Sequence, residues 1–235
     1  MPFNNKKVFG LIPARAGSKG VLGKNTYPIN SKLLIDFTID AALGCSNIDH
    51  VYVSSDSIDI LKHSEKRTSV IERPEKISND NSSAIDVVNH FYNFLVSNKL
   101  VSIEDFYVIY LQPTSPLRSK EIIDKSFEFM TKFNKSSLIS LVENDYTPFK
   151  SFSVDEYGLA QSLFDESLTN ECRQNLLPTY RANGAIYTFL ISQFIKNKGF
   201  PSNDSLAFIM DKETSLDIDT IKDIEDLKAI LAETS

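Results

Sequence analysis

The chain has 235 residues, which is enough for one large α/β domain with a complete hydrophobic core. Its formal net charge of −6 and the lack of a long basic tract argue against a general nucleic-acid-binding protein. The two cysteines, Cys45 and Cys172, lie far apart without a C-x-x-C pattern and indicate neither a disulfide framework nor a zinc site. The sequence contains neither a signal-peptide pattern nor an apolar run that could cross a membrane, so we expect a cytoplasmic protein.

The most informative stretch covers residues 8–25, where a short apolar strand ends at Pro13 and a loop rich in glycine and cations follows. The loop contains three glycines and three cations: Gly17, Gly20, Gly23, Arg15, Lys19 and Lys24. Glycines let backbone amides turn toward an anion, and cations among them add charge-assisted hydrogen bonds to phosphate oxygens. The spacing matches neither a P-loop nor a dinucleotide fingerprint. The stretch predicts a polyphosphate site, with a flexible basic surface loop as the alternative.

Strand and helix patterns alternate along most of the chain. The predicted strands cover residues 8–12, 50–56, 69–71, 106–111, 137–142, 181–187 and 205–210. The predicted helices cover residues 33–43, 57–66, 84–96, 121–133, 191–197 and 221–232. This alternation predicts an α/β fold with a largely parallel, doubly wound sheet that binds ligands at the carboxyl ends of its strands.

Two further stretches are expected at that ligand-binding edge. Residues 112–118 read QPTSPLR, a turn in which two prolines fix two hydroxyls directly after a core strand. A rigid turn alone would not need Gln112 at the strand tip, so we favour a binding role for this side chain. Ser83 precedes a helix and is expected to be its N-cap, although a helix N-terminus can also hold an anion or the edge of a nucleobase.

The segment Ser215-Leu216-Asp217-Ile218-Asp219-Thr220 carries two carboxylates at spacing i, i+2. In an extended segment these point to the same face, and the apolar residue between them is buried. Like charges held together are costly without a cation, and oxygen ligands suit Mg²⁺ bound to substrate phosphates. The alternative is that Asp219 or Thr220 caps the final helix, which explains one carboxylate but not both.

From residue 144 to 178 the alternation stops. Prolines, a glycine and apolar residues without clear periodicity indicate hairpins and irregular structure there. Such apolar side chains often cover a partner chain. We therefore expect a dimerisation subdomain at about residues 143–180, with a simple covering loop as the alternative.

Four of these motifs, taken together, resemble the acylneuraminate cytidylyltransferases, the CMP-sialic acid synthetase family. They are IPARAGSKGVLGKN at 12–25, LQPTSPLR at 111–118, RANGAIY at 181–187 and SLDIDT at 215–220. Ala16 and Leu22 differ from the glycine and proline common in that family, but neither change removes a ligand group. The resemblance implies one Rossmann-like, three-layer α/β/α nucleotidyltransferase domain over residues 1–235, acting as a homodimer. It also implies transfer of CMP from CTP to a nine-carbon 2-keto sugar acid, such as sialic, legionaminic or pseudaminic acid, with release of pyrophosphate.

The resemblance also implies roles for individual residues. Arg15 and Lys24 would hold the CTP phosphates, in a loop completed by Ser18, Lys19 and Asn25. Arg73 and Ser83 would lie near the cytidine and ribose, and the sugar would be faced by Gln112, Thr114 and Asn183. Lys150 and Arg173 resemble the basic residues expected near the sugar carboxylate, with a reach across the dimer left open. Mg²⁺ would be held by Asp217 and Asp219, which with Arg15 and Lys24 form the implied catalytic set.

Two rival functions remain open at this point. A related nucleotidyltransferase could act on an eight-carbon sugar acid or a sugar phosphate instead. A non-catalytic nucleotide-binding protein would be expected to lack a loop cation or a metal carboxylate, and here none is missing. The implied chemistry needs no histidine base, which agrees with the lack of a histidine candidate.

Overall fold

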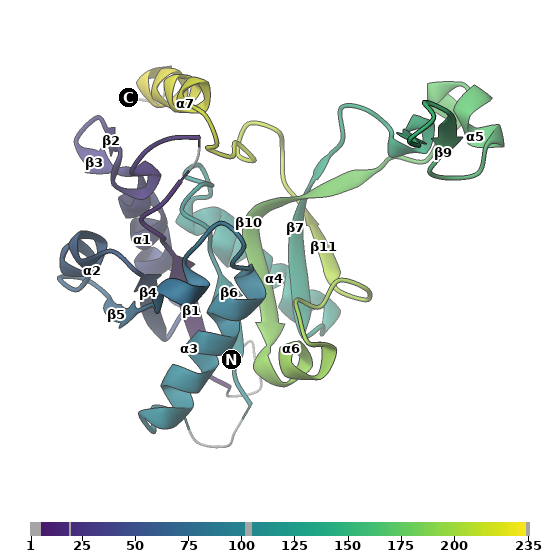
Figure 1. Cartoon of the computed structure of the whole chain (residues 1–235). Coiled ribbons are helices and arrows are strands. Elements are labelled where there is room, and N and C mark those ends of the chain that lie inside the picture. Colours follow the sequence, from purple (N-terminus) through teal and green to yellow (C-terminus); the bar gives the residue numbers. More distant parts are fainter. Residues whose placement is uncertain (1–5, 19, 102–104, 234–235) are drawn as a thin grey trace.

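The computed structural model describes residues 6–18, 20–101 and 105–233, and a seven-stranded sheet forms its centre (Figure 1). The strands are β1 (Val8–Pro13), β4 (His50–Ser55), β5 (Ser69–Glu72), β6 (Tyr107–Tyr110), β7 (Ser137–Glu143), β10 (Tyr180–Leu190) and β11 (Leu206–Ile209). Their order across the sheet is β11-β7-β10-β6-β1-β4-β5. Strand β10 runs antiparallel to β6 and β7, and the other neighbouring pairs are parallel. The expected mostly parallel sheet is confirmed.

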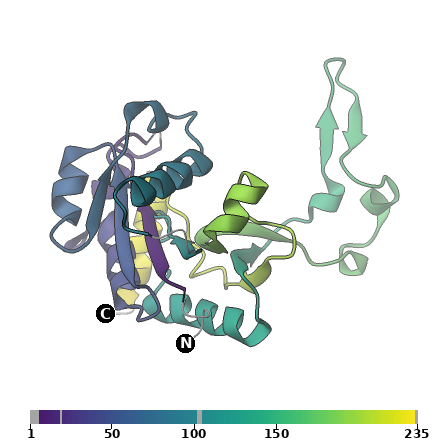
Figure 2. The same ribbon diagram turned by 90° about the horizontal axis from the view of Figure 1, so that it is seen from below.

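Helices cover both faces of this sheet and give three layers (Figures 1 and 2). One face is covered by α1 (Leu34–Gly44), α2 (Ile58–Ser64) and α4 (Lys120–Phe133), and the other by α3 (Ala84–Ser97) and α6 (Ile191–Asn197). Strand β1 serves both cores, because Val8 and Ile12 pack with the first group and Phe9 and Leu11 with the second. Among the described residues, no helix combines the length and the apolar character needed to cross a bilayer.

The sequence fixes where several helices begin through serine N-caps. The hydroxyls of Ser57, Ser83 and Ser119 each accept a hydrogen bond from a backbone N–H in the first turn of α2, α3 and α4. Each of these helices therefore starts within one residue of its predicted start. The structure also contains a small hairpin that the pattern does not predict, formed by β2 (Pro28–Ile29) and β3 (Lys32–Leu33).

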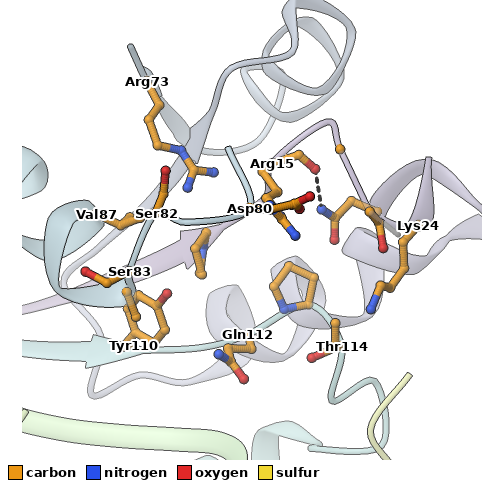
Figure 3. Close-up of a pocket in the computed structure, with 16 residues that line it drawn as sticks. Arg15, Lys24, Arg73, Asp80, Ser82, Ser83, Val87, Tyr110, Gln112 and Thr114 are labelled. Carbon is orange, nitrogen blue, oxygen red and sulfur yellow. Dashed lines mark hydrogen bonds and ion pairs between the residues drawn. The ribbon is translucent and has the colours of Figure 1, made fainter. Parts of the chain in front are cut away.

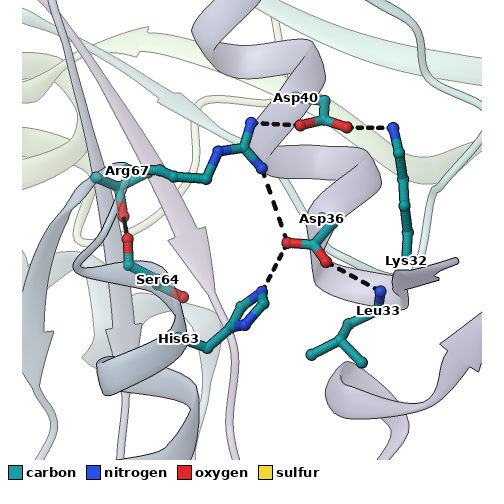
Figure 4. A network of polar contacts seen from close by, with 8 residues as sticks. Lys32, Leu33, Asp36, Asp40, His63, Ser64 and Arg67 are labelled. Carbon is teal, nitrogen blue, oxygen red and sulfur yellow. Dashed lines mark hydrogen bonds and ion pairs between the residues drawn. The ribbon is translucent and has the colours of Figure 1, made fainter.

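A polar network joins β3, α1 and α2 on one side of the sheet (Figure 4). The Asp36 carboxylate lies 2.8 Å from His63 Nε2. One helical turn later, Asp40 accepts hydrogen bonds from Lys32 and Arg67. The network therefore fastens α1 and its preceding hairpin to the segment that follows α2.

A third apolar cluster lies beside the first loop and ties the end of the chain to its beginning. It consists of Val21, Ile29, Leu34, Ile218, Ile224 and Leu227. The last two residues belong to α7 (Ile221–Glu233), which packs here through its apolar face. Burial of Ile218 in this cluster agrees with the expectation for the residue between the two carboxylates.

Residues 144–179 form an excursion that projects away from the sheet (Figures 1 and 2). It contains the hairpin of β8 (Phe152–Val154) and β9 (Ala160–Ser162) and the short helix α5 (Ser167–Asn170). Several large apolar side chains on it are exposed: Tyr146, Phe152, Val154, Tyr157, Leu159, Leu163, Phe164 and Leu177. The predicted break in the alternation is thus present, and its role in dimerisation stays a prediction.

Candidate functional site

A cavity of about 280 Å³ lies where the carboxyl ends of β1, β5 and β6 meet the N-terminus of α3 (Figure 3). Its lining includes many of the residues that the resemblance implicated: Arg15, Ser18, Lys24, Asn25, Arg73, Ser83, Gln112 and Thr114. They come together because parallel strands end at one edge of the sheet and their loops meet there. Lys19, which was also predicted to bind the nucleotide, lies outside the described residues.

Side chains from distant turns hold the first loop in shape. Arg15 Nη1 donates to Asp80 Oδ1 at 2.9 Å, and Asn25 Nδ2 donates to the Arg15 carbonyl oxygen at 2.8 Å. The backbone N–H of Ala16 donates to Asp56 Oδ1 at 2.8 Å. No role was predicted for Asp56, at the end of a predicted strand, or for Asp80, in a polar stretch, because only the fold brings them against the loop.

Arg73 forms part of the cavity wall although only 5% of its surface is exposed. Its Nη2 donates to the Ser54 carbonyl oxygen at 3.1 Å, and its Nε has no hydrogen-bond partner among the described residues. Burial lowers the pKa of Arg73, and the nearby Asp56 charge opposes that shift. A buried guanidinium with an unused donor beside a cavity is suited to a ligand that offers an acceptor.

Ser83 is both an N-cap and a cavity residue. Its hydroxyl accepts from the Asp86 backbone N–H at 3.1 Å, and its own backbone N–H donates to Asp86 Oδ2 at 2.9 Å, which forms a capping box. The expected capping role is therefore present. Because the cap lies in the lining, the first turn of α3 faces the cavity.

Gln112, which also lines the cavity, stands at the start of a turn held by a fully buried cation. Arg118 donates to the carbonyl oxygens of Gln112 and Ala185, each at 3.0 Å, and to Thr38 Oγ1 at 2.7 Å. Desolvation lowers the pKa of Arg118 to about 9. The Gln112 side chain passes so close to Gly184 that a Cβ on that glycine would lie 2.4 Å from Gln112 Oε1. Sequence analysis did not assign Arg118, since an arginine after a proline turn gives no signal of burial.

The two-carboxylate segment lies beside the first loop and the Gln112 turn. The backbone N–H of Ile218 donates to the Thr114 carbonyl oxygen at 2.8 Å. Lys24 Nζ donates to the Ile218 carbonyl oxygen at 2.6 Å and to Asp219 Oδ1 at 2.9 Å. Lys24 therefore lines the cavity and at the same time binds one of the two carboxylates.

Asp217 is the carboxylate with the clearer electrostatic signature. Although the residue is exposed, the chain around its carboxylate desolvates it and raises its pKa. A hydrogen bond from the Thr114 hydroxyl opposes this shift, and the Asp219 charge raises the pKa further. The net direction is upward. The two carboxylates are thus close enough to repel one another, as their spacing predicted.

Two contacts fix the position of the segment. A Cβ on Gly20 would lie 1.9 Å from the Asp219 carbonyl oxygen, so only glycine lets the first loop approach this closely. The backbone N–H groups of Asp219 and Thr220 both donate to Asp223 Oδ2, at 2.9 and 2.6 Å. Asp223 thus satisfies the donors at the start of α7. Within the described residues, no group of three or more His, Cys, Asp or Glu side chains gathers to hold a metal.

The other predicted site residues lie elsewhere. Asn183 is buried in β10 and does not line the cavity. Lys150 and Arg173 lie on the excursion, where they line a separate cavity of about 420 Å³ together with Tyr146 and Thr147. Within one chain, these two cations are therefore not brought to the first loop.

The chain is similar in sequence to several enzymes named for cytidylyl transfer. The sequence model of the family described as cytidylyltransferase matches residues 9–233. The N-acylneuraminate cytidylyltransferase of Escherichia coli is 31% identical over 93% of this chain and 51% of its own length. The CMP-N,N'-diacetyllegionaminic acid synthase of Legionella pneumophila is 33% identical over 91% of both chains, and the pseudaminic acid cytidylyltransferase of Campylobacter jejuni is 30% identical over 94% of both. The chain thus spans about half the length of the Escherichia coli relative.

Solved structures share the fold at low sequence identity. A CMP:2-keto-3-deoxy-manno-octonic acid synthetase complexed with CTP superposes with a TM-score of 0.67 at 17% identity, covering 97% of this chain and 100% of the other. A 4-diphosphocytidyl-2C-methyl-D-erythritol synthase from Anaerococcus prevotii gives a TM-score of 0.65 at 15% identity, covering 98% of each chain. At these identities the likeness concerns the fold alone, and it confirms the expected nucleotidyltransferase architecture.

Proposed function

Because the chain belongs to the cytidylyltransferase family, we propose that it transfers CMP from CTP to the anomeric hydroxyl of a nine-carbon 2-keto sugar acid. Pyrophosphate is the second product. The observation that carries this proposal is the cavity in which Arg15, Lys24 and Arg73 meet the N-terminus of α3, beside a pair of carboxylates. The nine-carbon class rests on relatives at about 30% identity, whose names specify sialic, legionaminic and pseudaminic acids.

CTP would lie along the cavity with its phosphates at the first loop. Arg15 and Lys24 supply the positive charge there, and Ser18 and Asn25 complete the loop. Arg73 and Ser83 would face the cytidine and ribose, where the unused Nε donor of Arg73 suits an acceptor on the ligand. Gln112 and Thr114 continue the same wall toward the sugar acid.

The chemistry of the donor set fits Mg²⁺. The pKa of Asp217 is raised by desolvation and by the Asp219 charge, and a bound cation would relieve both. Asp219 already forms an ion pair with a cation, the Lys24 ammonium. Mg²⁺ is commonly bound by one or two carboxylates together with substrate phosphates, so a third protein ligand is not required. Asp217 and Asp219 would hold the ion, which would neutralise phosphate charge and lower the pKa of the attacking hydroxyl.

The remaining work is positioning and charge neutralisation by the chain itself. The bond that forms joins the anomeric oxygen to the α-phosphorus, and the bond that breaks links this phosphorus to the bridging oxygen of the leaving pyrophosphate. Arg15 and Lys24 stand where negative charge accumulates on the leaving group. Arg118 keeps the Gln112 backbone in place, so that the sugar-facing wall is rigid before the substrate binds.

The acid-binding side would be completed by a second copy of the chain. Lys150 and Arg173 are the predicted partners of the sugar carboxylate, yet both lie on the excursion and neither lines the cavity. The same excursion exposes apolar side chains, including Val154, Leu159 and Leu163, and these suit burial against another subunit. In a homodimer, each excursion would deliver its two cations to the cavity of the other subunit.

The eight-carbon alternative is supported by the fold likeness alone, because the solved octonic acid synthetase is only 17% identical. Pyrophosphate release with CTP and Mg²⁺ against a panel of nine-carbon sugar acids tests the proposal. We expect release with one member of the panel and none with ATP or GTP. Silence across the panel despite CTP binding would favour an eight-carbon acid or a sugar phosphate. Failure to bind CTP would contradict the proposed function altogether.

A further inference from the structure

Asn183 sits at an irregularity in the sheet, where the register of β10 against β7 shifts between Ala182 and Tyr187. The side chain is 7% exposed. Its Oδ1 accepts from Ser140 Oγ at 2.6 Å and from the Ala185 backbone N–H at 3.2 Å. Its Nδ2 donates to Ser215 Oγ at 2.9 Å and to Met210 Sδ at 3.3 Å.

These four contacts use the whole hydrogen-bonding capacity of the side chain. A primary amide has two donor hydrogens and an oxygen that accepts two hydrogen bonds. The orientation of the amide is fixed, because the Ala185 N–H can only donate and must therefore meet the oxygen. No donor or acceptor of Asn183 is left for a substrate, and the residue does not line the cavity. Asn183 therefore has no free polar atom for the contact with the sugar that the resemblance implied.

One of the four partners connects Asn183 to the two-carboxylate segment. Ser215 lies two residues before Asp217, and its hydroxyl is the acceptor for Asn183 Nδ2. On the other side of Asp217, the segment is held by Thr114, Lys24 and the capping contacts of α7. On the N-terminal side, Leu216 packs against the third apolar cluster, and Asn183 supplies a polar anchor from a buried position in the sheet.

We propose that Asn183 is a positioning residue that fixes the Asp217–Asp219 carboxylates through Ser215, and not a residue that binds the sugar. The inference rests on the proposed function in one respect, namely that these carboxylates hold the divalent cation. Removing a residue that orients metal ligands without touching the metal typically lowers metal affinity by about 10- to 100-fold. Loss of the Asn183–Ser215 bond should therefore weaken cation binding and leave the affinity for the sugar acid in place.

Mn²⁺ binding to the full chain in the presence of CTP, followed by electron paramagnetic resonance, provides a readout that does not depend on turnover. Asn183→Ala and Ser215→Ala should each weaken Mn²⁺ binding by about 10-fold, and the double variant should be no worse than the single ones. Ser215→Thr keeps the hydroxyl and should retain the wild-type affinity. The KM for the sugar acid should change by less than about 2-fold in all four variants, since neither side chain contacts the sugar.

Ser205→Ala is the matched control. It also removes a partly buried hydrogen bond between two serine hydroxyls, that of Ser205 with Ser137 at 2.9 Å, but at the other end of β7. It should leave Mn²⁺ binding unchanged. If Asn183→Ala does not fold, Ser215→Ala carries the test alone. A raised KM for the sugar acid with wild-type Mn²⁺ binding would overturn the inference, as would wild-type Mn²⁺ binding in Ser215→Ala. These results would leave the proposed function standing, whereas a wild-type chain that binds neither CTP nor Mn²⁺ would overturn both.

Discussion

The cavity and the excursion differ in how much of a site one chain can build. At the cavity, the predicted nucleotide-binding residues that the structure describes all converge within a single chain. On the excursion, Lys150 and Arg173 stand beside exposed apolar side chains and face no part of the first loop. The difference supports our proposal that one subunit builds the nucleotide half of the site and that a second copy would complete the acid half.

The physical reason lies in the layers of the fold. The cavity forms where parallel strands end together and helices cover both faces, so its walls are fixed by two buried cores. The excursion extends past the end of the sheet, where no layer packs on it (Figure 2). In the homodimer that we propose, contacts with the other subunit would set its position relative to the nucleotide.

The largest expected effect comes from removing charge at the cavity. Arg15→Ala or Asp217→Ala should lower kcat by about 100-fold or more, because each removes a group that acts on charge developing in the transition state. Asp226→Ala, at an exposed carboxylate of α7, should retain nearly full turnover. The measurement is steady-state pyrophosphate release, and near-normal turnover by either cavity variant would contradict these assignments.

A smaller and more selective effect is expected on the excursion. Lys150→Met removes the charge and keeps much of the apolar stem, so it should raise the KM for the sugar acid by about 10-fold through loss of a charge-assisted contact. CTP affinity by calorimetry should stay the same, because the proposed contact of Lys150 is with the sugar acid and not with the nucleotide. Lys125→Met on α4 serves as the surface-lysine control. A loss of CTP affinity with an unchanged KM would reverse the assignment of the two regions.

Gly20→Ala should separate the first loop from the carboxylates without changing any charge. The new methyl would lie 1.9 Å from the Asp219 carbonyl oxygen, so the loop must move, and Mn²⁺ and CTP affinity should fall by about 10-fold. Gly17→Ala adds the same methyl to the same loop where no heavy atom lies within 4 Å, and its affinities should fall less. Equal effects of the two substitutions would show that the close approach at Gly20 has no special role.

The smallest effect concerns stability outside both regions. Partial burial raises the pKa of Asp40, but hydrogen bonds from Lys32 and Arg67 outweigh this and leave the pKa below its ordinary value. The carboxylate therefore stabilises the fold above its unfolded pKa, and this contribution is lost as the pH falls through the folded pKa. Asp40→Asn should cost about 0.5–1 kcal/mol in the free energy of unfolding at pH 7.

Urea unfolding at pH 7 and at about pH 3 checks this difference, which should shrink at the lower pH. Catalysis should be unaffected, because no residue of this network (Figure 4) lines the cavity. A cost that is the same at both pH values would mean that Asp40 acts through packing and not through its charge.

The sequence predicts those parts of the molecule that depend on local patterns. Periodicity gives the strands and helices, and serine caps mark several helix starts, because both follow from residues close in the chain. The cluster of glycines and cations after β1 predicts a polyphosphate site for the same reason, and the structure places this loop at the cavity. The spacing of Asp217 and Asp219 likewise predicts that the carboxylates lie together around a buried Ile218.

The remaining features depend on contacts between distant segments. The motif RANGAIY predicts a strand. It does not indicate that β10 is antiparallel or that its register shifts beside Asn183. The full burial of Arg118 depends on acceptors from α1 and β10, and the pairing of Lys24 with Asp219 spans almost the whole chain. No local pattern encodes such partners, so the positioning roles were the part that the sequence could not predict.

Mixing two inactive variants tests the division between cavity and excursion most directly. One chain carries Asp217→Ala, and the other carries both Lys150→Met and Arg173→Met; they are assayed together at a sugar acid concentration well below KM. If each excursion completes the cavity of its partner, random pairing gives mixed dimers with one intact site, and activity should recover to about a quarter of the wild-type value. A mixture no more active than its two parents would contradict a site shared between subunits.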